Sequence, residues 1–245
     1  MGGTLSPAAQ VASRSPWLTL NSAQQTALKW LAILCMLLDH ANRTLWAFQP
    51  WLYTLGRVAF PLFTFLIATN LVLRGVSARR YRLPLLLLGL ISQAPASLAL
   101  GRELLPLNIF FTLLLGTSFF SVQRWVSCRL PNSRRWRSLG WLASIYLALL
   151  SGISVEYGPL GVLVVPALML FLKRPTALGA VVVALLLVSI NGPHFSSLAA
   201  LLMFLLVKVV RTLKFPPLPR LKWFFYAFYP MHLTLLWLLS RAFAR

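Results

Sequence analysis

The sequence predicts an all-α fold, a polytopic transmembrane helical bundle with about nine spans and a cytoplasmic N-terminus. Hydrophobic residues make up 59% of the 245-residue chain and charged residues only 11%. The apolar residues form long runs, and a helix needs about 20 of them to cross the hydrocarbon core of a membrane. Runs such as residues 85–90 and 181–188 lack the period-two alternation of a membrane barrel. We therefore expect helices that are solvated by membrane lipids.

The candidate spans follow one another along most of the chain. They cover residues 29–48, 52–73, 83–100, 107–123, 139–155, 158–172, 176–190, 197–210 and 223–240. Several are short for a membrane helix, so eight spans or a re-entrant segment between residues 158 and 210 is an alternative. Residues 1–26 form a polar N-terminal segment, expected in the cytoplasm, without the pattern of a cleaved signal peptide. Residues 27–245 are expected to form a single transmembrane domain.

The position of the basic residues predicts the orientation. The net charge is +20, which by itself would fit a nucleic-acid partner. With the N-terminus in the cytoplasm, however, most Lys and Arg fall in loops on the cytoplasmic side, as the positive-inside rule requires. The largest groups have five members each: Arg124, Arg129, Arg134, Arg135 and Arg137, and Lys208, Arg211, Lys214, Arg220 and Lys222; a group of four consists of Arg74, Arg79, Arg80 and Arg82. We therefore expect contacts with anionic lipid headgroups and no nucleic acid.

Acidic residues are scarce, and the predicted topology places them together. The three in the chain are Asp39, Glu103 and Glu156. All three fall on the predicted outer side, where Arg57 begins the second span. Asp39 stands beside His40 at the end of the first apolar run. Ionisable groups in a membrane are costly and usually functional, so Asp39 and His40 are the first candidates for chemistry.

Each candidate also has a structural interpretation. Asp39 can pair with Arg43 one helical turn on, or with Arg57 across a helical hairpin. His40 can accept a proton near neutral pH, and Glu156 is the carboxylate expected to orient it, because adjacent side chains on one helix diverge. His232 is expected near the middle of the membrane.

Other polar groups carry weaker signals. Glu103 is expected to be a solvated charge, and His194 a loop residue. Cys35 and Cys128 lack the spacing of a redox or zinc site. No histidine spacing indicates a metal, so we expect none.

The sequence KWLAILCMLLDH (29–40) is followed by GRVAFPLFTFLIA (56–68). These two segments resemble the first two helices of the TraX family, conjugative-plasmid proteins associated with N-terminal acetylation of pilin. Further similarities, in order, are RLPLLLLGLISQAP (82–95), NIFFTLLLG (108–116), EYGPLGVL (156–163) and FFYAFYPMHL (224–233). The paired DH, the GRxAFPLF segment and the late FYxxHL are the most specific.

The resemblance implies a multi-pass acetyltransferase of the bacterial inner membrane that uses acetyl-CoA and acts on a pilin subunit. It marks Asp39, His40, Arg57, Asn108, Glu156 and His232 as motif positions. In that reaction His40 would deprotonate the amine or carry the acetyl group, and Arg57 or Asn108 would stabilise the oxyanion. Asp39 would hold Arg57, while Glu156 or His232 would relay a proton. The cations expected to attract CoA phosphates are Arg79, Arg80, Arg82, Arg134 and Arg135.

Two alternatives stay open on the sequence. One is transfer of an acyl group to a hydroxyl of a periplasmic glycan or lipid. The other is a non-enzymatic component of assembly or transport, in which the polar residues are structural contacts or a proton path.

Overall fold

The computed structural model describes residues 19–46, 48–131, 133–191, 196–217, 219 and 221–243. Within these residues the regular structure is helical, and one isolated backbone bridge joins Leu107 to Val155. The elements are α2 (Ser22–Thr44), α3 (Pro50–Gly56), α4 (Ala59–Val72), α5 (Arg79–Ala99), α6 (Ile109–Ser127), α7 (Arg134–Ser151), the 3₁₀ turn η2 (Gly152–Ser154), α8 (Gly158–Lys173), α9 (Ala177–Ser189), α10 (Ser196–Thr212) and α11 (Lys222–Phe243). The all-α prediction is confirmed.

Each predicted apolar run falls mainly in helix, but the second run is divided into α3 and α4 at Arg57 and Val58. Among the described residues, three segments are long and apolar enough to cross a membrane: Pro50–Val72, Arg79–Ala99 and Ile109–Ser127. Two shorter helices, α8 and α9, are also apolar. The chain therefore has the helices of a membrane protein. The total of about nine spans and the cytoplasmic N-terminus stay predictions.

The start of α2 lies before the predicted end of the polar N-terminal segment. Asn21 accepts a hydrogen bond from the Gln24 backbone at 2.9 Å, and the Gln24 side chain accepts one from the Asn21 backbone at 3.0 Å. This reciprocal capping box satisfies two backbone donors and begins the helix at Ser22. Residues 22–26, although polar, are thus part of α2. Residues 1–18 and His194 lie outside the described residues.

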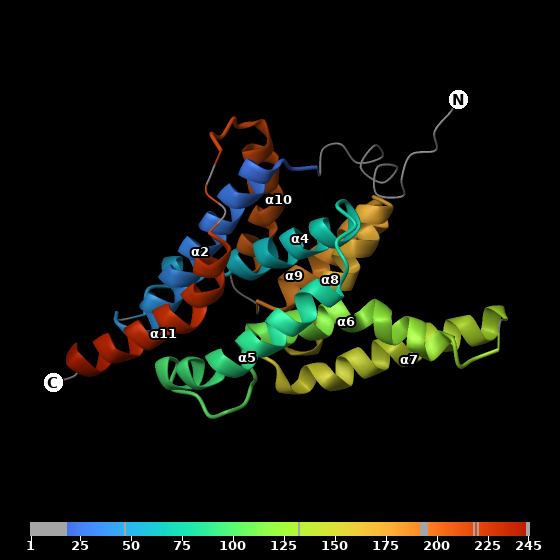
Figure 1. Ribbon diagram of the computed structural model, residues 1–245, viewed down its shortest axis with the longest axis horizontal. Coiled ribbons are helices and arrows are strands. Elements are labelled where there is room, and N and C mark those ends of the chain that lie inside the picture. The colour runs from blue at the N-terminus through green and yellow to red at the C-terminus, as the bar shows by residue number, and fades with distance from the viewer. Residues whose placement is uncertain are drawn as a thin grey trace.

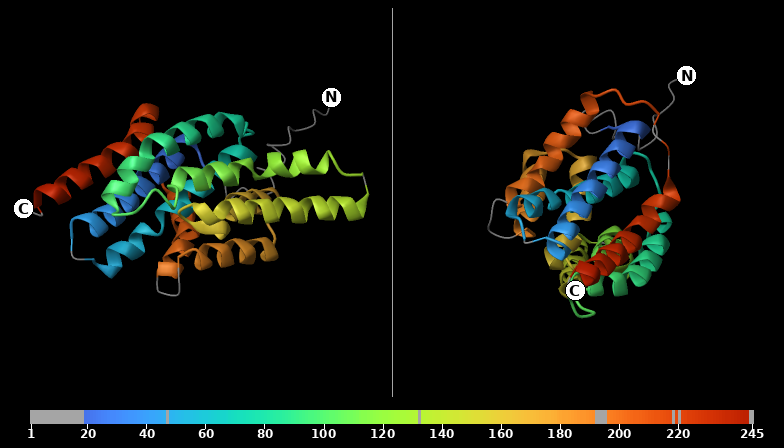
Figure 2. Two further views of the ribbon diagram at one scale, coloured as in Figure 1. Left: turned by 90° about the horizontal axis from the view of Figure 1, so that it is seen from below. Right: turned by 90° about the vertical axis from the view of Figure 1, so that its left-hand side faces the viewer.

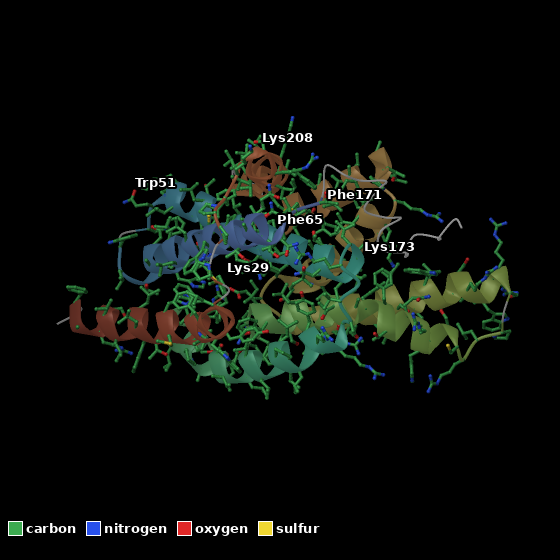
Figure 3. All side chains as sticks on the ribbon, turned by 45° about the horizontal axis from the view of Figure 1, so that its top comes forward. Lys29, Trp51, Phe65, Phe171, Lys173 and Lys208 are labelled. Atoms are coloured by element: carbon green, nitrogen blue, oxygen red, sulfur yellow. The ribbon has the colours of Figure 1, made fainter. Side chains whose placement is uncertain are left out.

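Helix α4 forms the centre of the core. Phe60, Leu62 and Phe65 on this helix are fully buried, and Phe65 is labelled inside the bundle in Figure 3. Helix α4 packs mainly against α8 and α2. Around it, α11 packs against both α5 and α2, and Figures 1 and 2 show α2 and α11 running along the same end of the molecule.

Helices α6 and α7 form a long antiparallel hairpin whose tip projects beyond the other helices (Figures 1 and 2). The body of α6 is held close to α8 by a glycine. A Cβ at Gly116 would lie 2.9 Å from the Val162 carbonyl oxygen, which is too close for any side chain. This close packing fixes the first turns of α6 beside the functional residues described next.

Candidate functional site

A pair of histidines joins α2 to α11. His40 Nδ1 lies 2.8 Å from His232 Nε2, and the two rings are nearly parallel, 5.1 Å apart. Both side chains are buried. Phe228 stacks on the other face of His232, with ring centres 4.7 Å apart. His232 lies near the middle of α11 and is a direct partner of His40. Its depth in the membrane stays a prediction.

The hydrogen bonds of this pair define which nitrogen atoms carry protons. His232 Nδ1 lies 2.8 Å from the Phe228 carbonyl oxygen, and a carbonyl oxygen can only accept. In the neutral pair His232 therefore carries its proton on Nδ1 and accepts at Nε2, so His40 donates from Nδ1. His40 Nε2 then retains its lone pair. This nitrogen has the state that a general base requires.

The carboxylate of Asp39 pairs with two arginines at once. Oδ2 lies 2.9 Å from Arg43 Nη2 and 2.8 Å from Arg57 Nη2, while Oδ1 accepts from Arg43 Nε at 3.1 Å. The two structural pairings considered from the sequence thus occur together. They give a buried cluster with one net positive charge beside His40.

Arg57 is held in place by aromatic rings as well as by Asp39. Its guanidinium lies 4.5 Å from the centre of the Tyr53 ring and 5.8 Å from that of Tyr157, which are cation–π distances. Within the described part of the chain, Arg57 Nε is buried without a hydrogen-bond partner. Arg57 therefore keeps hydrogen-bonding capacity that the ion pairs do not use.

Gly56 allows the Asp39 cluster to form. A Cβ on this residue would lie 2.2 Å from Asp39 Cβ and 2.7 Å from Asp39 Cγ. Only glycine permits α3 to approach α2 this closely. The adjacent loop is fixed by Asn42, whose side chain accepts from the Gln49 backbone at 2.7 Å and donates to its carbonyl at 3.0 Å.

Glu156 does not orient His40, contrary to the expectation from the sequence. Its carboxylate accepts a hydrogen bond from Arg102 Nη1 at 3.1 Å, and the role of orienting partner belongs to His232.

The next residue, Tyr157, stacks on Phe60 with ring centres 3.9 Å apart. Burial raises the pKa of Tyr157 to about 12, so its phenol stays protonated at neutral pH.

Asn108 also has a different role from the predicted one. Its side-chain oxygen accepts from the Phe110 backbone at 3.1 Å and caps α6, while its side-chain nitrogen donates to the Gly89 carbonyl at 2.8 Å. Its backbone N–H donates to Gln93 at 2.9 Å. The amide is thus committed to joining α6 to α5, which leaves Arg57 as the candidate for oxyanion stabilisation.

Two adjoining cavities lie next to these groups. The larger has a volume of about 510 Å³ and an apolar lining from α2, α4, α5, α6 and α11. The smaller, of about 20 Å³, is lined by Asp39, His40, Arg57, Glu156 and Tyr157, together with shared wall residues. Met36, Ile109 and Tyr229 line both cavities. The two cavities therefore adjoin at these three residues, and the smaller one contains His40 and the ion pair of Asp39 and Arg57.

The cations that line the large cavity are only partly those expected from the sequence. They are Lys29, Arg74 and Arg80, and Lys29 is labelled on α2 in Figure 3. The sequence carries a signal for Lys29, because it lies eleven residues before His40 and Ile33 and Met36 fall between them at helical spacing. These residues line one face of α2 over about 16 Å, at 1.5 Å rise per residue.

The other predicted phosphate-binding arginines lie elsewhere. Arg79 is exposed at the start of α5 and does not line the cavity, and Arg82 donates to the Ser121 hydroxyl on α6. Arg134 and Arg135 are exposed at the tip of the α6–α7 hairpin. Among the described residues, no group of three or more His, Cys, Asp or Glu side chains is arranged to hold a metal ion.

These features define a helical membrane protein whose interior has a mostly apolar cavity beside a smaller one that is lined by His40 and the ion pair of Asp39 and Arg57. The chain belongs to the TraX family, because the family model described as TraX protein matches residues 24–240. A curated relative, Protein TraX of Escherichia coli (strain K12), is 40% identical over 65 residues. That alignment covers 25% of this chain and 26% of the relative, so it spans only about a quarter of the relative's length. No solved structure matches the chain.

Proposed function

We propose that this protein is a membrane-embedded acetyltransferase, which transfers acetyl from cytoplasmic acetyl-CoA to the N-terminal amine of a conjugative pilin subunit. The observation that carries the proposal is that two cavities share lining residues: basic side chains line the larger one, and His40, a base with a free lone pair, lines the smaller one. The TraX membership supports the choice of pilin as acceptor. The proposed location is the bacterial inner membrane, with several spans.

The large cavity fits a donor with an anionic head and a long, mostly uncharged arm. Its volume of about 510 Å³ lies in the range of about 300–1,000 Å³ that is usual for small-molecule sites. Arg74 and Arg80 lie where the cavity passes between the end of α4 and the start of α5, and Lys29 lies on the facing side of α2. In this arrangement the three cations bind the phosphates of CoA, and the arm extends toward Met36.

The small cavity supplies the groups for acyl transfer. The neutral pilin amine attacks the thioester carbonyl carbon, and His40 Nε2 takes the proton that the amine nitrogen gives up as the C–N bond forms. Arg57 stabilises the negative charge on the carbonyl oxygen of the tetrahedral intermediate. As this intermediate collapses the C–S bond breaks, and the proton held by His40 passes to the departing CoA sulfur. The products are an N-acetylated pilin and CoA.

His232 acts here as a positioning residue, since it holds the proton of His40 on Nδ1 and keeps Nε2 free. Asp39 neutralises one of two buried guanidinium groups and fixes Arg57 beside the reaction. Tyr157, protonated at neutral pH, adds no negative charge to the site. Before the reaction, therefore, the two histidines are neutral, Asp39 and Arg57 form an ion pair, and Tyr157 is uncharged.

The test compares the intact mass of the pilin subunit from cells that carry wild-type protein or His40→Gln. Glu103→Gln is the matched control, because Glu103 is an exposed acid outside the site. We expect the pilin to lose one acetyl group with His40→Gln only, while both variants reach the membrane at wild-type levels. A pilin that keeps its acetyl group with His40→Gln would refute the proposed role of His40.

Two other outcomes distinguish the alternatives. An unchanged pilin mass together with a loss of acetyl groups from envelope sugars or lipids would identify a hydroxyl acceptor. Normal acetylation of every molecule in cells that lack the protein, together with a defect in pilus assembly, would indicate a non-enzymatic component.

A further inference from the structure

The wall between the two cavities is made of three buried side chains from three helices. Met36 lies on α2, Ile109 is the first residue of α6, and Tyr229 lies on α11. Their exposed fractions are 7%, 7% and 4%. A group that travels from the large cavity to His40 has to pass between them.

The space beyond this wall is very small. Its volume is about 20 Å³, while a cavity needs about 10–15 Å³ to hold one water molecule. A two-carbon acyl group places a single methyl beyond its carbonyl carbon, and this space suits a group of that size. Each further methylene would have to displace Met36, Ile109 or Tyr229.

Two of the three wall residues are held firmly. Tyr229 packs edge-on against Phe110, with ring centres 4.8 Å apart, and against His232 at 5.5 Å. Ile109 follows the capping residue Asn108, which ties α6 to α5 through the Gly89 carbonyl. These contacts fix the ring and the helix start, so the wall cannot widen at Tyr229 or at Ile109 without breaking them.

We propose that Met36, Ile109 and Tyr229 select the acyl group by length, so that acetyl reaches His40 and longer chains are rejected. This inference rests on the proposed acyltransferase function. It assigns donor specificity to the wall between the cavities and leaves recognition of the CoA head to the cations at the entrance.

The test measures transfer of acetyl, propionyl and butyryl groups from the corresponding CoA thioesters to a pilin N-terminal peptide, with purified full-length protein. Ile109→Ala widens the wall, and Met36→Ala opens the same wall from α2. Leu88→Ala is the matched control, because Leu88 lines only the large cavity. We expect wild type and Leu88→Ala to prefer acetyl over propionyl by about 10–200-fold, the usual discrimination for one methylene. The two wall variants should lose most of that preference.

The possible failures are distinguishable. Equal use of acetyl and butyryl donors by wild type would overturn the length selection and leave the proposed function standing. The same conclusion follows if Leu88→Ala broadens the donor range as much as both wall variants do. If wild type transfers no acyl group from any donor, the proposed function fails, and the selection fails with it.

Discussion

The ion-pair cluster around Asp39 allows a quantitative test by the substitution Asp39→Asn. This change keeps the shape of the side chain and removes its charge, so two guanidinium groups lose their counter-ion. The Arg57 side chain is only 11% exposed and that of Asp39 only 6%, whereas that of Arg43 is 20% exposed. Most of the lost folding stability therefore comes from the unpaired charge of Arg57, because Arg43 can turn toward solvent more easily.

Stranding a buried charge costs about 3–5 kcal/mol, while an exposed pair contributes about 0.2–1 kcal/mol. Asp39→Asn should therefore destabilise the fold by about 3–5 kcal/mol. For a chain of this size each kcal/mol lowers Tm by about 2–4 °C, which predicts a decrease of about 6–20 °C. Thermal unfolding of the protein in detergent micelles, followed by circular dichroism, measures this change.

The double variant Asp39→Asn/Arg57→Met provides the control. Methionine removes the stranded charge and keeps much of the apolar volume of the arginine stem, so part of the lost Tm should return. A Tm of Asp39→Asn within about one degree of wild type would refute the reasoning, since it would mean that Arg57 needs no counter-ion. A double variant less stable than Asp39→Asn would show that Arg57 contributes mainly through its aromatic contacts.

Four further predictions follow from single contacts. His232→Phe should reduce kcat for acetyl transfer by about 10²–10⁴-fold, because His40 loses the acceptor that fixes its tautomer, with little change in the KM for acetyl-CoA. Gly56→Ala should destabilise the protein by about 1–3 kcal/mol in thermal melts, because its Cβ would overlap Asp39. Asn108→Ala should cost about 1–2 kcal/mol of stability through the lost α6 cap, yet leave kcat at a permissive temperature near wild type; a large loss of kcat there would restore a catalytic role. Arg80→Gln should raise the KM for acetyl-CoA, whereas Arg134→Gln should not. An equal rise in KM with both variants would contradict the assignment of the phosphates to the cavity, because the hairpin tip would then bind them as well as the cavity does.

The helices were predictable because membrane solvation leaves little choice of backbone structure. A run of apolar residues in lipid has to satisfy its own hydrogen bonds, and a helix does so locally. The sequence therefore identified the helical regions. The division of the second run at Arg57 and Val58 also has a local cause, because Pro61 lacks the N–H that would bond the Arg57 carbonyl in a continuous helix. The start of α2 was predicted too late in the chain, because most of its first turns are polar. These polar residues nevertheless face the protein interior or the cavity, namely Ser22, Gln24, Gln25 and Thr26.

The local part of the site was also predictable. Asp39 and Arg43 are one helical turn apart, and Arg57 follows a short connection that returns the chain to the same end of α2. Short-range geometry of this kind can be worked out from spacing alone. Asn108 was misjudged, since a polar residue just before an apolar run is above all a candidate helix cap, and its amide is used in this way.

The histidine pair shows where prediction from one sequence stops. His40 and His232 are 192 residues apart in the chain. The position of each residue along its own helix can be predicted, but it does not show that the two side chains lie at the same height in the bundle. Their common height depends on the tilt and packing of α11 against α2 and α5, which depend on many small contacts. What the sequence does contain is the helical spacing of Lys29, Ile33, Met36 and His40. Lys29, Ile33 and Met36 line the large cavity, while Met36 and His40 line the small one, so this face of α2 contributes to both cavities.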